Sequence, residues 1–182
     1  MTKHGRLILL MGISGSGKTT LGRMLTARLR QRAAPVCFID GDVVRGFFGD
    51  DLGFSAAERN QATRRMAFGA FTVVELGIDV VMANIAGSSE TRAFLRSKFP
   101  RYIEVFCSVD FATAGRHDVK GVYRRAMALE DPQLVGHDVD FDEPTDPSVV
   151  VHPYQEPPEE SLERILAFLD TESSARPHGD DA

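Results

Sequence analysis

Gly12-Ile13-Ser14-Gly15-Ser16-Gly17-Lys18-Thr19 is the stretch of this sequence that decides the expected fold. It matches the phosphate-binding loop pattern G-x-x-x-x-G-K-[ST] at every fixed position. Glycines let the backbone curl with its N–H groups pointing at phosphate oxygens, and a following helix adds its positive dipole end. The alternative is a flexible Gly/Ser turn between a strand and a helix. The strand before it, the helix after it and the Lys-Thr pair favour a phosphate loop.

This loop predicts that the chain binds ATP with Mg²⁺. Lys18 would reach the β- and γ-phosphates, and the Thr19 hydroxyl would bind the metal. The residues expected to hold the nucleotide are Gly12, Ser14, Gly15, Ser16, Gly17, Lys18, Thr19 and Thr20.

The segments around the loop indicate an α/β fold. Residues 7–11 are apolar throughout, as in a parallel strand that is covered on both faces. After the loop, Leu21, Leu25 and Leu29 fall on one face of a predicted helix. A second apolar strand over residues 36–39 then leads into Asp40-Gly41-Asp42.

Asp40 and Asp42 are candidate catalytic residues because of where their strand ends. In an open parallel sheet, ligands bind beyond the carboxyl ends of the strands, so both carboxylates would face a bound triphosphate. Asp42 would accept a proton from an attacking hydroxyl, or hold the metal through water. The alternative is an ordinary Asp-Gly turn.

Composition limits the other classes of function. The chain has 182 residues, enough for one domain with a sizeable core, and its formal net charge of -5 argues against nucleic-acid binding. Its two cysteines, Cys37 and Cys107, lie in apolar runs and are interpreted as buried hydrophobes in a reducing compartment. Residues 7–11 are too short for a signal peptide or a membrane span, so we expect a cytoplasmic protein.

A second helix is predicted from Ala56, because Ser55 and Glu58 have the spacing of a capping box. This helix carries three arginines: Arg59, Arg64 and Arg65. Such a trio is commonly a solvated face. Its closeness in sequence to Asp42 and Arg45 favours at least one arginine that binds an anionic substrate.

Two further stretches of the sequence are specific enough to indicate a family: Ile39-Asp40-Gly41-Asp42-Val43-Val44-Arg45 and Asp51-Leu52-Gly53-Phe54-Ser55-Ala56-Ala57-Glu58-Arg59. Both resemble the corresponding stretches of adenylylsulfate kinase. The resemblance covers residues 5–170. It implies transfer of the γ-phosphate of ATP to the 3′-hydroxyl of adenosine 5′-phosphosulfate, in sulfate assimilation or a dedicated biosynthetic pathway. It also implies a homodimer and a three-layer P-loop fold, in which helices flank a central parallel sheet of about five strands beneath a mobile lid.

The resemblance also implies roles for single residues. Asp42 matches the catalytic base, Asp40 supports it and the hydrated metal, and Lys120 matches a lid lysine near the transferring phosphate. Residues expected at the acceptor are Arg45 and Arg59 on its 5′ anionic end, Phe54 stacked on its base, and Ile85 and Leu134 in its pocket. Arg116 is expected near the ATP adenine, because His117 occupies the place of the family's usual arginine.

The sequence departs from the family pattern around the acceptor. Ala62 replaces an asparagine, residues 84–89 replace a Phe-Ile-Ser-Pro-Tyr-Arg stretch, and Leu134 replaces an aromatic residue. We expect Asn84, Ser88 and Ser89 to be the groups that could compensate. Two alternatives stay open: the same chemistry on another acceptor, such as a CDP-linked compound or a small metabolite alcohol, and a non-catalytic nucleotide-binding regulator.

The rest of the chain predicts one kinase domain over residues 1–170. Strands are expected over 79–83, 102–109 and 148–151, and a closing helix over 157–169. Residues 118–147 are expected to form the lid, with a short helix over 121–129, which would keep water away from ATP. The tail over 171–182 is expected to be disordered. His137 and His152 are interpreted as surface and structural residues, and no cluster has zinc-site spacing.

Overall fold

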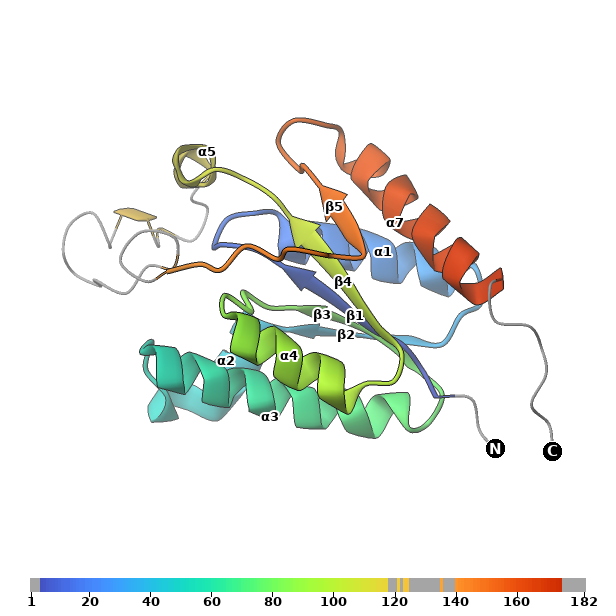
Figure 1. Cartoon of the computed structure of the whole chain (residues 1–182), viewed down its shortest axis with the longest axis horizontal. Helices are drawn as coiled ribbons and strands as arrows, with labels where there is room; N and C mark the ends of the chain where they lie inside the picture. The colour runs from blue at the N-terminus through green and yellow to red at the C-terminus, as the bar shows by residue number, and fades with distance from the viewer. Residues whose placement is uncertain (1–3, 118–120, 122, 125–134, 136–139, 175–182) are drawn as a thin grey trace.

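The computed structural model describes residues 4–117, 121, 123–124, 135 and 140–174. Its centre is a five-stranded sheet of strand order β2-β3-β1-β4-β5, in which every neighbouring pair is parallel (Figure 1). The strands are β1 (Leu7–Met11), β2 (Val36–Asp40), β3 (Asp79–Ala83), β4 (Tyr102–Cys107) and β5 (Val149–Val151). The predicted parallel sheet of about five strands is therefore confirmed.

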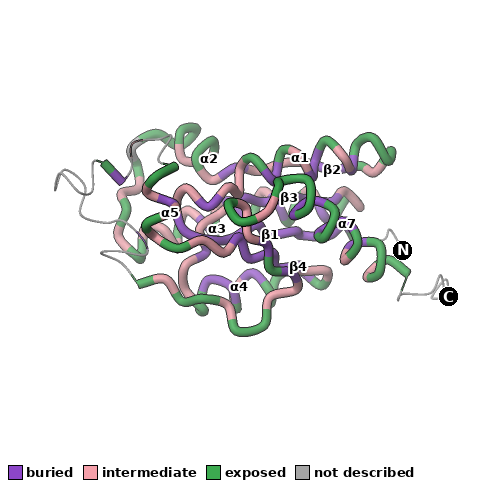
Figure 2. The backbone as a smooth tube through the Cα atoms, turned by 90° about the horizontal axis from the view of Figure 1, so that it is seen from above, coloured by how far each residue is buried: buried purple, intermediate pink, exposed green. Residues whose placement is uncertain are grey.

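β1 is buried along its length (Figure 2), and its alternating side chains enter two separate cores, one on each face of the sheet. Ile8 and Leu10 pack with helices α1 (Lys18–Gln31) and α7 (Pro158–Ser174). Leu7, Leu9 and Met11 pack on the other face, where α3 (Ala56–Val74) and α4 (Ser89–Lys98) lie. All five residues of the strand are 0% exposed, so the phosphate loop that follows starts from the buried central strand of the sheet.

Three helices that the sequence patterns did not predict complete the frame: α2 (Gly41–Phe48), α4 and α5 (Phe111–Arg116). A single 3₁₀ turn, η1 (Gly49–Asp51), follows α2. The Asp-Gly-Asp stretch is therefore the start of a helix and not an ordinary turn. Asp40 is its N-cap, because its side chain accepts a hydrogen bond from the backbone N–H of Asp42.

Some element boundaries differ from those expected. β4 ends at Cys107, two residues before the expected end, because its neighbour β5 ends at Val151, the register partner of Cys107. α7 continues to Ser174, so residues 171–174 belong to the closing helix and not to the tail. Most of the expected lid helix over 121–129 lies outside the described residues. Of its described residues, Tyr123 and Arg124 are helical.

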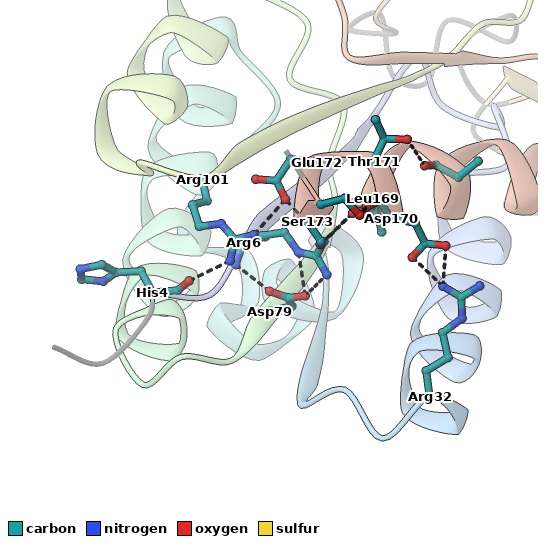
Figure 3. A network of polar contacts seen from close by, with 12 residues as sticks. His4, Arg6, Arg32, Asp79, Arg101, Leu169, Asp170, Thr171, Glu172 and Ser173 are labelled. Atoms are coloured by element: carbon teal, nitrogen blue, oxygen red, sulfur yellow. Dashed lines mark hydrogen bonds and ion pairs between the residues drawn. The ribbon is translucent and has the colours of Figure 1, made fainter. Parts of the chain in front are cut away.

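A buried polar network joins the two ends of the described chain. It lies at the end of the sheet where the strands begin, opposite the phosphate loop (Figures 1 and 3). Arg6, at the entrance to β1, binds the Asp79 carboxylate at 2.6 Å and donates to the Ser173 hydroxyl at 3.1 Å. Arg101 pairs with Glu172 at 2.8 Å. These contacts fix the last turn of α7 against the starts of β1, β3 and β4.

In the part of the chain described here, no helix combines the length and apolar character needed to cross a bilayer.

Candidate active site

The loop between β1 and α1 has the backbone that a phosphate nest requires. Gly12, Gly15 and Gly17 have φ angles of 146°, 74° and 83°, which residues with side chains rarely adopt. Space is equally limiting at Gly12, where a Cβ would lie 2.6 Å from the carbonyl oxygen of Cys107. The glycines of the pattern are therefore required by this loop's own geometry.

The Lys18 ammonium lies across the loop. Its Nζ donates to the carbonyl oxygens of Gly12 at 2.9 Å and Ile13 at 2.6 Å, and lies 3.2 Å from the Ser16 hydroxyl. Ser16 is itself fully buried. This places a positive charge at the mouth of the loop, where phosphate oxygens bound by the backbone N–H groups would meet it.

Two tyrosines that were not predicted as site residues hold the outer side of the loop. The Tyr123 hydroxyl donates to the Ser14 carbonyl at 2.7 Å, and the Tyr154 hydroxyl donates to the Gly15 carbonyl at 2.6 Å. The Tyr154 ring stacks on His117, with 4.2 Å between ring centroids. These partners are 109 and 139 residues apart in sequence, so no local pattern could have paired them with the loop.

Thr19 and Asp40, the two predicted metal residues, are in direct contact. The Thr19 hydroxyl donates to Oδ2 of Asp40 at 2.8 Å, while Oδ1 of the same carboxylate caps α2 at Asp42, at 2.9 Å. Hydroxyl and carboxylate oxygens suit Mg²⁺, which protein sites hold through one or two such groups together with phosphates and water. This donor set therefore fits the metal that the loop implies, and the cap holds Asp42 in the first turn of α2.

The predicted acceptor residues Arg45, Phe54 and Arg59 come together as one platform. The guanidinium carbons of Arg45 and Arg59 lie 4.5 and 5.2 Å from the centroid of the Phe54 ring, which is 42% exposed. Arg45 also donates to the carbonyls of Leu52 and Gly53 at 3.0 and 2.7 Å, and Arg59 donates to the Phe54 carbonyl at 2.7 Å. The result is a partly exposed aromatic ring with two guanidiniums close to it.

The predicted capping box fixes this platform to α3 and is confirmed. The Ser55 side chain accepts from the N–H of Glu58, and the Glu58 carboxylate accepts from the N–H groups of Ser55 and Gly53. The Ser55 hydroxyl and then the Gly53 and Ser55 N–H groups lower the pKa of Glu58 below its ordinary value. The carboxylate of Glu58 therefore holds the turn that carries Phe54.

The polar side chains that replace the family's acceptor segment are bonded within the protein. Ser88 caps α4 by accepting from the N–H of Thr91 at 3.2 Å. Ser89 donates its N–H and its hydroxyl to Asp142, at 3.0 and 3.1 Å. Asn84 also bonds to neighbouring residues. The expectation that these three side chains replace the family's substrate contacts gains no support from this geometry.

The remaining predicted residues have different outcomes. Arg116 lies at the end of α5, beside the phosphate loop, and donates to the Thr113 hydroxyl at 2.7 Å. Ile85 follows β3, and its carbonyl accepts from the Gly12 N–H at 3.4 Å. Lys120 and Leu134 lie outside the described residues.

Three features define a P-loop phosphotransferase: a parallel sheet with a phosphate loop after its central strand, a Thr-Asp pair that joins the start of α1 to the end of β2, and a cationic aromatic platform in the segment after α2. The chain belongs to the adenylylsulphate kinase family, whose sequence profile matches residues 4–152.

Known proteins agree with this family. An adenylyl-sulfate kinase of Gloeothece citriformis is 35% identical over 93% of this chain and 97% of its own length. A probable bifunctional SAT/APS kinase 2 of Sorangium cellulosum is 37% identical over 91% of this chain, which spans only 29% of that protein. The structure of the Mycobacterium tuberculosis APS kinase CysC in complex with AMPPNP and APS superposes with a TM-score of 0.87 at 28% identity, covering 92% of this chain and 98% of that one.

Proposed function

We propose that this protein transfers the γ-phosphate of ATP to the 3′-hydroxyl of adenosine 5′-phosphosulfate. The observation that carries the proposal is the platform formed by Phe54, Arg45 and Arg59, in a domain that also has a complete phosphate loop. An aromatic face suits the acceptor's adenine, and two guanidiniums suit its 5′ phosphosulfate. The similar CysC structure is that of a complex with AMPPNP and APS.

The donor site follows from the loop. Its inward N–H groups and the start of α1 bind the β- and γ-phosphates, and Lys18 moves from the loop carbonyls to the phosphate oxygens. Mg²⁺, held by the Thr19 hydroxyl and, through water, by Asp40, would neutralise charge on those oxygens. Arg116 is assigned to the adenine end because α5 borders the loop.

The proton transfer is assigned to Asp42. Its carboxylate accepts the 3′-hydroxyl proton while that oxygen bonds to the γ-phosphorus and the bond to the β-phosphate oxygen breaks, which releases ADP. Asp40 acts on this step by capping α2 and so fixing the turn that carries Asp42. Lys120 of the lid is assigned to the charge on the transferring group.

A second candidate keeps this chemistry and changes the acceptor to a CDP-linked compound or a small metabolite alcohol. The observation that favours it is that Ser88 and Ser89 are engaged by Thr91 and Asp142, while the family's tyrosine and arginine are absent from that segment. Without replacements, each lost buried polar contact would weaken adenylylsulfate binding by about 1–3 kcal/mol.

The experiment is coupled ADP release by the purified protein with Mg-ATP, in the presence of adenylylsulfate, a CDP-linked acceptor or no acceptor. Acceptor-dependent turnover at micromolar adenylylsulfate supports the first proposal, and turnover only with the other acceptor supports the second. ATP binding without turnover on either would favour a nucleotide-binding regulator. Asp42→Asn is the matched variant: if it folds, binds ATP and keeps full turnover, the assignment of the base is wrong.

The homodimer that the family resemblance implies stays a prediction. Light scattering on the purified chain measures it directly, since a dimer doubles the mass of 20.0 kDa.

A further inference from the structure

The segment over residues 84–87 joins the donor and acceptor halves of the site through one side chain. Asn84 directly follows β3, and its N–H donates to the Leu10 carbonyl of β1 at 3.1 Å. Its Oδ1 accepts from the Ala86 N–H at 2.7 Å and from the Thr63 hydroxyl at 3.3 Å. Its Nδ2 lies 3.1 Å from the Met66 sulfur. The carboxamide is therefore committed to neighbouring residues, with both acceptor positions of Oδ1 in use.

Ala86, the residue that Asn84 holds, has a strained backbone. Its φ of 45° lies in the left-handed region, which residues other than glycine rarely adopt. Its N–H is fixed by Asn84, and its carbonyl accepts from Nη1 of Arg92 at 3.0 Å. Arg92 is buried at 7% exposure, and its Nε lies 3.7 Å from the equally buried Glu104 carboxylate. The surroundings hold this conformation from both sides of one residue.

Hydrogen bonds connect the segment around Asn84 to the phosphate loop in one direction and to Arg59 of the acceptor platform in the other. On the donor side, the Ile85 carbonyl between Asn84 and Ala86 accepts from the N–H of Gly12, the first glycine of the phosphate loop, at 3.4 Å. On the acceptor side, the single proton of the Thr63 hydroxyl is shared between Oδ1 of Asn84, at 3.3 Å, and the Arg59 carbonyl oxygen, at 3.0 Å. Arg59 lies one turn before Thr63 in α3, and its guanidinium carbon lies over the Phe54 ring.

We propose that Asn84 is a positioning residue that sets the acceptor platform relative to the phosphate loop, by holding Ala86 in its left-handed conformation and Thr63 in its rotamer. This inference rests on the proposed kinase function. A direct substrate contact is the weaker explanation, because the carboxamide already bonds to Ala86 and Thr63. An apolar side chain at this position could not replace either hydrogen bond.

The test compares Asn84→Ala with the double variant Asn84→Ala/Ala86→Gly. We expect Asn84→Ala to raise the acceptor KM about 5- to 20-fold, with the ATP KM within about twofold of wild type, because Lys18 bonds to Gly12, Ile13 and Ser16 of the loop itself. Glycine adopts a left-handed φ without strain, so Ala86→Gly should recover part of the acceptor KM. Recovery by a residue without a side chain distinguishes positioning from substrate contact.

Thr63→Val removes the hydroxyl while keeping the shape, and it should raise the acceptor KM in the same direction. The matched control is Thr72→Val on the same helix, since the exposed Thr72 hydroxyl donates only to the Gly69 carbonyl in the described contacts, at 2.8 Å. This control should leave both KM values unchanged. An unchanged acceptor KM in folded Asn84→Ala, or no recovery in the double variant, overturns the proposal.

Amide hydrogen exchange on the full chain separates this inference from the proposed function. Asn84→Ala should speed exchange at the Ala86 and Gly12 amides, and Ala86→Gly should restore protection at Gly12. If wild type has no turnover with adenylylsulfate, the proposed function fails while this readout still tests the link. If the Gly12 amide exchanges equally fast in wild type and Asn84→Ala, the link itself is refuted, whatever the acceptor.

Discussion

Replacing Asp40 with asparagine separates a structural role from a chemical one at the same carboxylate. Asp40 is 7% exposed, caps α2 through Oδ1 and accepts the Thr19 hydroxyl through Oδ2. Asparagine caps helices about as well as aspartate, and its amide nitrogen can donate to the Thr19 hydroxyl oxygen in place of the bond that Thr19 donates to Asp40, so Asp40→Asn should change the free energy of unfolding by less than about 0.5 kcal/mol. Asp40→Ala loses the cap as well, which should cost about 1 kcal/mol or more.

The chemical role predicts a much larger effect on turnover. The amide nitrogen of asparagine cannot accept the Thr19 hydroxyl, and the negative charge beside the predicted metal position is lost. Hydrogen bonds to charged groups contribute about 1.5–3 kcal/mol, so kcat/KM should fall about 10- to 150-fold in Asp40→Asn, at 1.36 kcal/mol for each factor of ten. Higher Mg²⁺ should recover part of this loss.

Coupled ADP release across a Mg²⁺ titration measures the turnover, and thermal unfolding of the same preparations measures the stability. Wild-type turnover and Mg²⁺ dependence in Asp40→Asn would refute the metal assignment and leave Asp40 as a helix cap. Equal loss of stability in Asp40→Asn and Asp40→Ala would refute the capping argument instead.

Three further outcomes follow from the site and the core. Phe54→Leu keeps apolar contact but removes the aromatic face, so the acceptor KM should rise about 5- to 30-fold while the ATP KM stays constant, and an unaltered acceptor KM in the same kinetic assay would contradict the platform. The pKa of Glu58 is lowered from its ordinary value of 4.5, chiefly by the Ser55 hydroxyl, so its stabilising effect is complete above that pH and is lost as the pH falls through the folded value. Melting temperatures measured from about pH 6 down to about pH 3 should therefore fall more steeply for wild type than for Glu58→Gln, and parallel curves would disprove the linkage. Burial raises the pKa of the Cys107 thiol to about 12, so a thiol reagent near about pH 8 should label the half-buried Cys37 first and Cys107 only after unfolding, whereas rapid labelling of native Cys37→Ser would contradict this.

The parts of the site that the sequence predicted are those with local signals. The phosphate loop is a contiguous pattern after an apolar strand, and the capping box before α3 needs only residues 55 and 58. Arg45, Phe54 and Arg59 were expected at the acceptor because they lie within fifteen positions and carry the family resemblance, whereas their contact with one another as a platform was not predicted. Both the loop pattern and the capping box depend only on residues that are close together in the sequence, so they can be recognised without knowing the fold.

The parts that were missed depend on contacts distant in sequence. α2 was missed although its apolar residues Val43, Val44, Phe47 and Phe48 have helical spacing; none of the eight residues from Gly41 to Phe48 is buried, so this helix contributes no side chain to the core. Tyr123 and Tyr154 reach the loop only because α5 and the segment after β5 fold beside it. Asn84 looked like a substrate contact, whereas its partners Thr63 and Ala86 are set by the packing of α3 against β3.

The polar network at the starts of β1, β3 and β4 determines where another domain could be joined to this one. Arg6 bonds to Ser173 and to the Leu169 carbonyl, so the first strand and the last helix of the described chain leave the domain side by side (Figure 3). The phosphate loop lies at the opposite end of the sheet (Figure 1). A partner domain fused at either end would therefore leave both nucleotide sites open, and a short peptide connecting the two ends would permit new termini to be cut elsewhere on the surface.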